Sequence, residues 1–247
     1  LVPHLSKGKR GPDCKVGLWR IVRAILKRLK TGLQWRELPI IELFGRHKIS
    51  WQSVFYYFSK WSKDGSWYRL WTALLELNKR QLDMSSVQLD GSHTPVKRGG
   101  TAVAYQGRKK AKTTNMLFLT DQQGIPLACS QPVAGNHNDL FEIEKTVSKI
   151  ISTLMDACIA VKGLFLNADA GFDSKSLRTL CEQLDMFPNI DFNKRNTKTL
   201  AQHDYLFDPQ LYKERFVVER TNAWIDGFKN LIDIKLLEIY RINSKVI

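Results

Sequence analysis

The chain has 247 residues, 43% of them hydrophobic, and a formal net charge of +14 at pH 7. This length allows one large domain, or an ordinary domain with a smaller one. No apolar run approaches the roughly 18 residues that span a bilayer and no signal-peptide pattern opens the chain, which excludes a membrane protein. Four well-separated cysteines form no CxxC pair, which argues against a zinc knuckle and fits a reducing compartment. The chain begins at Leu1, not at a methionine, so we expect its true start to lie upstream.

The positive charge is concentrated in the first third of the chain. Residues 1–80 hold 17 Lys and Arg against 5 Asp and Glu, which is +12 of the total of +14. Such a concentration indicates a polyanionic partner, although a basic surface can also serve solubility alone.

Three helices are predicted in this basic region, after a flexible arm at 1–14. The first covers 15–30, with an apolar face and a basic stripe that includes Arg23 and Lys27. The second covers 51–62, with Ser50 as N-cap. It is expected to bury Trp51, Val54, Phe55, Phe58 and Trp61 and to expose Gln52, Tyr56, Lys60 and Lys63. The third covers 67–80 and is expected to bury Leu70, Trp71, Leu74 and Leu77.

Three short helices with a polar, aromatic exposed face resemble a helix-turn-helix module. Helix triplets also occur in proteins that touch no nucleic acid, but the local charge favours DNA. We therefore predict a small all-α DNA-binding domain over residues 1–84, with the 51–62 helix as the groove reader.

Strand patterns begin after this region. Strands are predicted at 87–90, 116–120 and 125–130, and the last two flank a hairpin turn at 121–124. Gly91 and Pro95 are expected to end the first strand, which leaves Asp90 at its carboxyl end. The glycine-rich connection between the first two strands is expected to be a solvated loop or a phosphate-binding segment. Its basic residues are Lys97, Arg98, Arg108, Lys109, Lys110 and Lys112.

Helices and strands then alternate to the end of the pattern. Asn138 is predicted to cap a helix over 139–155, and an apolar strand over 164–169 ends in Asp169. A helix over 175–184, a strand over 187–192 and a last helix over 211–231 follow. Phe216, Trp224 and Phe228 of the last helix are expected to bury against the sheet. The fold class is therefore α/β, with a mixed sheet and flanking helices over residues 85–247.

Three carboxylates stand out in this second region. Asp90 and Asp169 each follow an apolar strand, and a glycine comes within two residues of each. Glu219 lies mid-helix on the face of Tyr212, Arg215 and Asp226, among apolar neighbours where a buried carboxylate is costly without a cation.

Converging carboxylates suit one chemistry especially well. They can hold two divalent cations, one to activate the attacking oxygen and one to stabilise the leaving oxygen in phosphoryl transfer. Magnesium takes such hard oxygen ligands and keeps several waters, so histidine and cysteine are not required.

The chain resembles bacterial insertion-sequence transposases of the Asp-Asp-Glu class, which have a ribonuclease-H-like catalytic domain. The resemblance runs from about Leu29 to Lys229. It rests on TGLQWRELP, SVFYYFSKWSKDG, QLDGSHTPVKRGGTAVAYQGRKKAKTTN, LTDQQGIPLACSQPVAGNHNDL, NADAGFDS and RFVVERTNAWIDGFK.

This resemblance implies that Asp90, Asp169 and Glu219 are the catalytic, metal-binding triad, with Mg²⁺ or alternatively Mn²⁺. It further implies double-stranded DNA as partner, a homo-oligomer on DNA, and a cytoplasmic, nucleoid-associated bacterial protein. Two features depart from the family: Asp226 stands where a lysine usually follows, with Lys229 nearby, and the final segment lacks the usual arginine-rich character. The second departure raises the expectation of a truncated C-terminus.

Several residues have rival interpretations. Asp173 could replace Asp169 as ligand, although it suits a helix cap better. His93 and His137 could be a base and a ligand, or ordinary loop histidines, and the GNHND run at 135–139 could be a turn or part of the site. Arg215 and Arg220 could grip phosphate or pair with acids.

Two functions remain open from the sequence. The first is a transposase that binds terminal inverted repeats, cleaves at 3′ ends and transfers strands with a divalent cation. The second is a decayed transposase that binds repeat DNA without cutting it.

Overall fold

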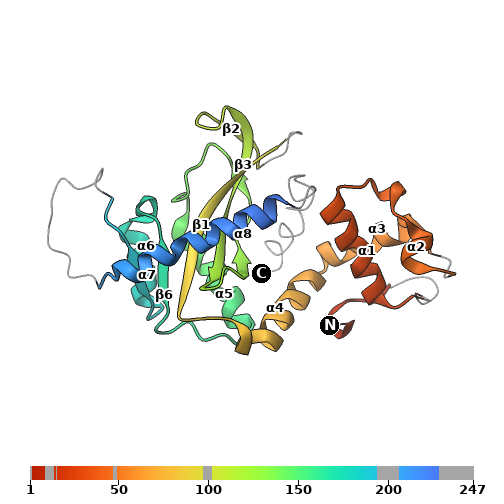
Figure 1. Cartoon of the computed structure of the whole chain (residues 1–247), viewed down its shortest axis with the longest axis horizontal. Helices are drawn as coiled ribbons and strands as arrows, with labels where there is room; N and C mark the ends of the chain where they lie inside the picture. Colours follow the sequence, from red (N-terminus) through yellow and green to blue (C-terminus); the bar gives the residue numbers. More distant parts are fainter. Residues whose placement is uncertain are drawn as a thin grey trace. The chain divides into compact units, whose positions relative to one another are not determined.

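A computed structural model describes residues 2–8, 14, 16–46, 49–96, 102–193 and 206–227 (Figure 1). The predicted Lys97, Arg98 and Phe228 lie outside these described residues. The chain divides into two compact units, one built on residues 1–74 and a second of Leu75–Trp224. Each is treated by itself below.

The first unit is all-helical. Its α-helices are α1 (Leu18–Thr31), α2 (Ile40–Phe44), α3 (Trp51–Lys63) and the start of α4 (Ser66–Asn78), with 3₁₀ turns η1 (Val2–His4) and η2 (Trp35–Glu37). The predicted helices are confirmed: Gly32, at φ 78°, ends α1, and the Ser50 side chain accepts a hydrogen bond from the Ser53 amide at the start of α3. The fully buried core of this unit is Ile21, Ala24, Ile25, Phe44, Val54 and Trp61.

Two core predictions for helices α3 and α4 are wrong. Phe55 is 44% exposed, and Tyr57 is buried instead. Because α3 carries aromatic residues on nearly every side, its apolar pattern does not single out one face, and Phe55 packs edge-on against Trp35 at the surface. Leu77, near the end of α4, is also exposed.

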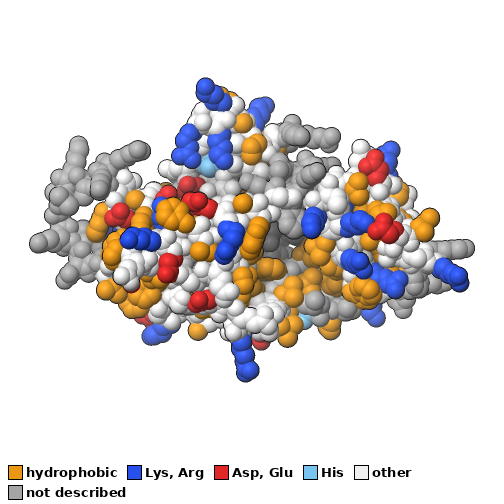
Figure 2. All heavy atoms as spheres, viewed as in Figure 1, with side chains coloured by type: hydrophobic (Ala, Val, Ile, Leu, Met, Phe, Trp, Pro, Cys, Tyr) orange, Lys and Arg blue, Asp and Glu red, His pale blue; other side chains and the backbone are white. Residues whose placement is uncertain are grey.

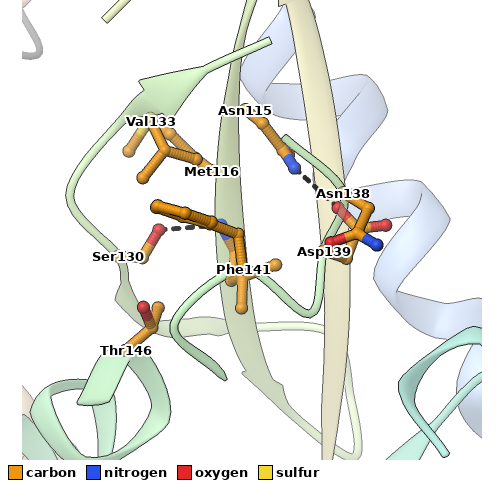
Figure 3. Close-up of a pocket in the computed structure, with 9 residues that line it drawn as sticks. Asn115, Met116, Ser130, Val133, Asn138, Asp139, Phe141 and Thr146 are labelled. Atoms are coloured by element: carbon orange, nitrogen blue, oxygen red, sulfur yellow. Dashed lines mark hydrogen bonds between the residues drawn. The ribbon is translucent and has the colours of Figure 1, made fainter. Parts of the chain in front are cut away.

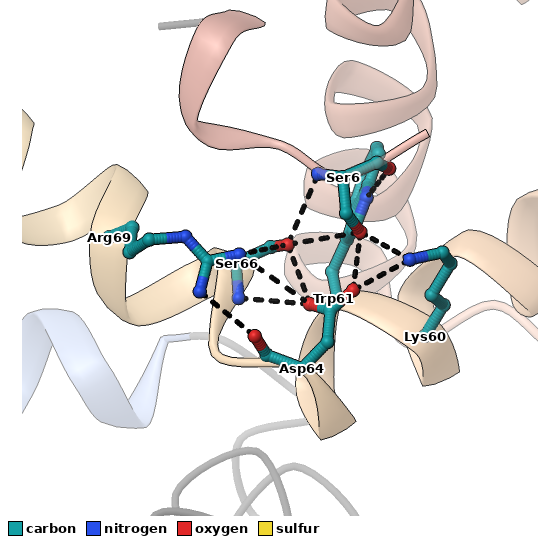
Figure 4. Close-up of polar contacts among 6 residues, drawn as sticks. All are labelled: Ser6, Lys60, Trp61, Asp64, Ser66 and Arg69. Atoms are coloured by element: carbon teal, nitrogen blue, oxygen red, sulfur yellow. Dashed lines mark hydrogen bonds and ion pairs between the residues drawn. The ribbon is translucent and has the colours of Figure 1, made fainter. Parts of the chain in front are cut away.

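A polar cluster joins the N-terminal segment to the α3–α4 corner (Figure 4). The Asp64 carboxylate accepts hydrogen bonds from Lys60 Nζ at 2.7 Å and from Ser66 Oγ at 2.6 Å, and from the Ser6 hydroxyl. Trp61 Nε1 donates to the Ser6 carbonyl at 2.9 Å. Burial alone would raise the pKa of Asp64, but these hydrogen bonds hold it well below its usual range.

The second unit is a curled mixed sheet with helices. The strands are β1 (Ser86–Pro95), β2 (Ala104–Gln106), β3 (Ala111–Asp121), β4 (Pro126–Cys129), β5 (Val133–Ala134), β6 (Phe165–Ala168) and β7 (Phe187–Ile190). The helical segments are η3 (Lys79–Gln81), α5 (Ile143–Asp156), η4 (Ala170–Phe172), α6 (Lys175–Gln183), α7 (Pro209–Lys213), η5 (Glu214–Phe216) and α8 (Val217–Asp226).

The sheet order places β1 at the centre. The order is β2-β3-β1-β6-β7, with β4 and β5 also paired to β3. β1 is antiparallel to β3 and parallel to β6, and β6 is parallel to β7. In Figure 1, α8 crosses the strands of this sheet.

Three boundaries differ from the sequence prediction. β1 does not end at Asp90, since its pairing with β3 continues through Gly91 to Pro95. Part of the expected loop after β1 forms β2, which makes a hairpin with β3. α5 begins at Ile143 and not at residue 139, so Asn138 does not cap it.

The late start of α5 has a local cause. Glu142 adopts a left-handed conformation at φ 47° immediately before the helix, so residues 139–142 cannot continue the helix backwards. Asp139 is therefore in a loop, where its side chain is available to the sheet.

Candidate functional site

Asp90 and Asp169 lie at neighbouring positions on two parallel strands. Leu89 pairs with Ala168 in the β1–β6 register, and each aspartate follows directly. The parallel pairing ends there, so both carboxylates lie at the edge where ligands collect in α/β sheets. Asp169 also starts η4, and its Oδ1 accepts a hydrogen bond from the Gly171 amide at 2.7 Å.

The environment of Asp90 disfavours its negative charge. Burial, helped by the negative charges of Asp139 and Asp169, raises the pKa of Asp90 to about 6, against the lowering effect of hydrogen bonds from the Gly91 backbone and Asn222. Asn222 of α8 donates from Nδ2 to Asp90 Oδ2 at 2.9 Å. A half-buried carboxylate beside two others is an electrostatic arrangement that a cation would relieve.

Asp139 is the residue whose role the sequence left most uncertain. Its Oδ1 accepts a hydrogen bond from Asn115 Nδ2 at 2.7 Å (Figure 3). The same oxygen lies 4.0 Å from His93 Nε2. A Cβ on Gly91 would come within 2.2 Å of that oxygen, so only glycine lets the Asp139 carboxylate lie against β1. Asn115 Oδ1 is buried without a hydrogen-bond partner in the described structure.

The run GNHND was the available signal for this cluster. This run indicated the correct loop, but the sequence alone does not distinguish a helix cap from a site residue within it. Only the folding of the loop onto β1 separates them.

α8 packs on the sheet through a different face from the one expected. Val218 and Thr221 are buried, Thr221 Oγ1 donates to the Gly124 carbonyl, and Arg220 donates to the Gln123 carbonyl. Phe216 and Trp224 are 55% and 53% exposed, so the prediction that they pack against the sheet is wrong. Polar anchoring to the β3–β4 turn and to Asp90 replaces the expected aromatic packing.

Glu219 is exposed on α8, one turn before Asn222. The expectation of a buried carboxylate there is therefore wrong. Asn222 of α8 contacts Asp90. Tyr212 of α7 makes a hydrogen bond with the Ala170 backbone, next to Asp169. Glu219 lies on the helical segment between these two contacts.

The start of α7 is fixed next to Asp169 by two buried asparagines. Asn189 Nδ2 donates to Asn167 Oδ1 at 2.7 Å and to the Asp208 carbonyl at 3.0 Å, while Asn189 Oδ1 accepts from the Asp208 amide at 2.8 Å. Asn167 Nδ2 donates to the Leu211 carbonyl at 3.1 Å. These bonds set where the α7–α8 segment begins its path over the sheet.

Two rival residues are occupied by other contacts. Asp173 accepts hydrogen bonds from Arg178 at 2.9 Å and from the Asn193 amide at 3.0 Å, which is a structural role. His137 stacks on Phe141 with ring centroids 3.7 Å apart.

The basic residues of the second unit fall in two places. Arg108, Lys109 and Lys110 are exposed at the β2–β3 turn, and Lys109 Nζ donates to the His93 carbonyl at 2.8 Å. Arg215 lies over the Tyr212 and Phe216 rings at 5.1 and 4.6 Å from their centroids.

The predicted DNA-binding residues of the first unit differ in availability. Arg23, Gln52 and Tyr56 are exposed. Lys27 forms a 2.7 Å ion pair with Glu42, and the Lys60 ammonium is held in the Asp64 cluster.

The donor chemistry at Asp90 and Asp169 fits a hard divalent cation. Carboxylate oxygens are typical ligands in such sites. Burial, with a smaller effect of the Asp139 and Asp169 charges, raises the pKa of Asp90, and a bound cation would oppose both effects. Within the described residues, no group of three or more His, Cys, Asp or Glu side chains is close enough to hold a metal ion.

A ribonuclease-H-like sheet with two aspartates at adjacent strand ends and a helix across them defines a class of metal-dependent nucleases. The family comparison agrees: residues 89–243 match the model described as DDE superfamily endonuclease. The chain belongs to this family, which implies dependence on a divalent metal. Residues 1–71 match a second model, described as putative transposase of IS4/5 family.

One solved structure supports the same fold. A piggyBac transposase synaptic complex with hairpin DNA overlays with a TM-score of 0.51 at 10% identity, covering 94% of this chain and 66% of that one. The chain thus spans slightly less than two thirds of the length of that relative. A Mos1 transposase paired-end complex with left transposon end matches at 12% identity and a TM-score of 0.33, covering 96% and 82% of the two chains. The fold comparison rests on the first of these.

No curated protein matches the sequence. Across the described part of the chain, no helix has the length and apolar character to cross a bilayer.

Proposed function

We propose that this protein is a transposase that binds the inverted repeats at the ends of its element, cleaves them and joins the 3′ ends to target DNA. The observation that carries the proposal is the pair Asp90 and Asp169, side by side where the β1–β6 pairing ends, with α8 attached to Asp90 through Asn222. Family membership supports the reaction class.

Asp90, Asp169 and Glu219 are the proposed metal ligands, and Mg²⁺ or Mn²⁺ is the proposed ion. Bound cations would supply activation of the attacking oxygen and charge stabilisation of the leaving oxygen. Asn222 donates a hydrogen bond to Asp90 Oδ2, which orients that carboxylate. The η4 amide of Gly171 likewise holds Asp169 Oδ1 and fixes that carboxylate in place.

Double-stranded DNA is the proposed substrate and partner. In the first unit we assign contacts to Arg23, Gln52 and Tyr56, whose side chains are exposed, with Lys27 and Lys60 becoming available only if their ion pairs open. In the second unit, Arg108, Lys109 and Lys110 project from the β2–β3 turn, and Lys97, Arg98, Arg215 and Arg220 are further proposed contacts. Assembly as a homo-oligomer on DNA, in the cytoplasm at the nucleoid, is part of the same proposal.

Alanine substitution of each proposed ligand tests the function. Asp90→Ala, Asp169→Ala and Glu219→Ala should each abolish cleavage of a repeat-containing duplex, while duplex binding without metal stays near that of the unsubstituted protein. Asp173→Asn is the matched control, because Asp173 is bound to Arg178. If purified Asp169→Ala still nicked the duplex at near wild-type rate, the assignment of Asp169 as a metal ligand would be wrong.

The alternative function, repeat binding without cleavage, has a distinct outcome in the same experiment. In that case the unsubstituted protein binds the repeats but does not cleave them with Mg²⁺ or Mn²⁺. The retained Asp90–Asp169 pair favours cleavage.

A further inference from the structure

The exposed side of η5 and α8 carries aromatic rings beside arginines. Phe216 and Trp224 are more than half exposed. Arg215 lies 4.6 Å from the Phe216 ring centroid, and Arg220 lies 5.4 Å from the Trp224 ring centroid. In Figure 2, hydrophobic and basic side chains lie next to one another along the line that α8 follows in Figure 1. We call Phe216, Arg220 and Trp224 the α8 stripe.

The spacing of the stripe places its members on one side of the helix. Residues 216, 220 and 224 are four apart, so they follow one another along a single face. The opposite face is already used, since Val218 and Thr221 are buried against the sheet and Asn222 binds Asp90. Large rings therefore remain in solvent on the same helix that carries Glu219.

We propose that the α8 stripe binds unpaired DNA bases, with Phe216 and Trp224 as stacking platforms. Arg220 already donates to the Gln123 carbonyl, and its remaining N–H groups would serve as the phosphate contact. Exposed rings alternating with cations are the arrangement that binds single strands, because every base has a π-face and every nucleotide a phosphate. Bases in an intact duplex hide those faces, so the stripe selects frayed or cleaved ends. The inference rests on the proposed function, which produces such ends.

A nucleic-acid strand fits the stripe better than a second copy of the chain. A two-fold contact between two stripes would bring Arg220 of each copy toward the other, and like charges repel. The negative phosphates of a nucleic-acid strand would instead be attracted to both Arg215 and Arg220. The two rings are about 12 Å apart along the helix. A single DNA strand that stacks on both rings must therefore span several nucleotides.

The test measures binding by fluorescence anisotropy in EDTA, so that cleavage plays no part. The probes are a labelled oligothymidine of about 12 nucleotides and a dumbbell duplex whose ends are closed by loops too short to stack on the protein. Trp224→Ala and Phe216→Ala should each weaken oligothymidine binding about tenfold and change dumbbell binding little. Trp224→Phe should retain most of the affinity. Phe187→Ala is the control, because Phe187 is 43% exposed on β7, away from α8.

Three outcomes would overturn the inference. The alanine variants could bind oligothymidine as tightly as the unsubstituted protein, or lose oligothymidine and dumbbell equally. Sedimentation without DNA could also show a dimer that Trp224→Ala converts to monomer, which would make the stripe a protein contact. Failure of the proposed function would instead appear as absent cleavage with Mg²⁺ or Mn²⁺, and it leaves these binding results readable.

Discussion

Asp90 connects the fold to the chemistry at the scale of a single residue. Burial and two neighbouring carboxylates raise its pKa to about 6, above the usual value of 3.8. A carboxyl with a higher pKa in the folded state binds its proton more tightly there than in the unfolded chain. Its contribution to stability is therefore fully present below pH 4 and is lost as pH rises through about 6.

This sign gives a prediction for the metal-free protein. Relative to Asp90→Asn, the free energy of unfolding of the unsubstituted protein should fall by up to about 3 kcal/mol between pH 4 and pH 7. Asparagine keeps an oxygen that can accept the Asn222 hydrogen bond, so the comparison isolates the charge. Urea unfolding in EDTA at several pH values measures the difference, and parallel curves for the two proteins would contradict it.

Gly91 provides a second prediction at the residue scale. Gly91→Ala should displace the Asp139 carboxylate, because the new Cβ would meet Asp139 Oδ1 at 2.2 Å. We expect a loss of about 1–3 kcal/mol in stability, since Asn115 then loses its acceptor in a buried position.

A double substitution separates the clash from other effects. In Gly91→Ala with Asp139→Ala the carboxylate is gone, so the glycine substitution should cost much less than it does alone. Urea unfolding of the four proteins of this cycle is the measurement. Additive losses would show that Gly91 and Asp139 do not meet.

The element that matters most is the α7–α8 segment, which is held by polar contacts at both ends. The Asn167–Asn189 pair anchors its start and Thr221 with Asn222 anchors its middle. Buried amides specify position more sharply than apolar contacts do, because each lost hydrogen bond leaves an unsatisfied group.

Asn189→Ala should therefore loosen this segment. It removes three hydrogen bonds, to Asn167 and to the Asp208 backbone, and we expect a loss of about 2–3 kcal/mol in stability. Because the anchor sets the path of the helix that carries Glu219, the increase in melting temperature with Mg²⁺ should also shrink. Asn136→Ala, at an exposed position, is the control for both readouts. An unchanged Mg²⁺ response in Asn189→Ala would show that the Asn189 hydrogen bonds do not affect the metal site.

At the scale of the whole molecule, charge is concentrated in the first 80 residues. If about five phosphates are neutralised, log K for duplex binding should fall with log salt at a slope near −4.5. Arg23→Gln should flatten this slope by about one unit, because its exposed guanidinium is free to meet phosphate.

The matched control for the salt experiment is Lys162→Gln. Lys162 is an exposed lysine of the second unit in a surface ion pair with Asp185. Its removal should leave the slope unchanged. A salt-independent signal from the unsubstituted protein would assign duplex binding to groups other than this basic region.

The sequence by itself determined the fold class, the basic helical region and the end of β6 before Asp169. Those features are local: apolar patterns mark strands, helices follow caps such as Ser50, and composition shows where charge lies. The end of β1 was not determined in this way, because its pairing with β3 continues past Asp90 and Gly91. The tertiary structure alone decided which face of α8 is buried. Val218, Thr221 and Asn222 face the sheet because the Gly124 turn and Asp90 provide hydrogen-bond partners there. The pattern of apolar residues along the chain does not reveal such partners, because they are distant in sequence. For the same reason the approach of Asp139 to Gly91, across 48 residues of chain, became visible only once the loop before α5 had folded back onto β1.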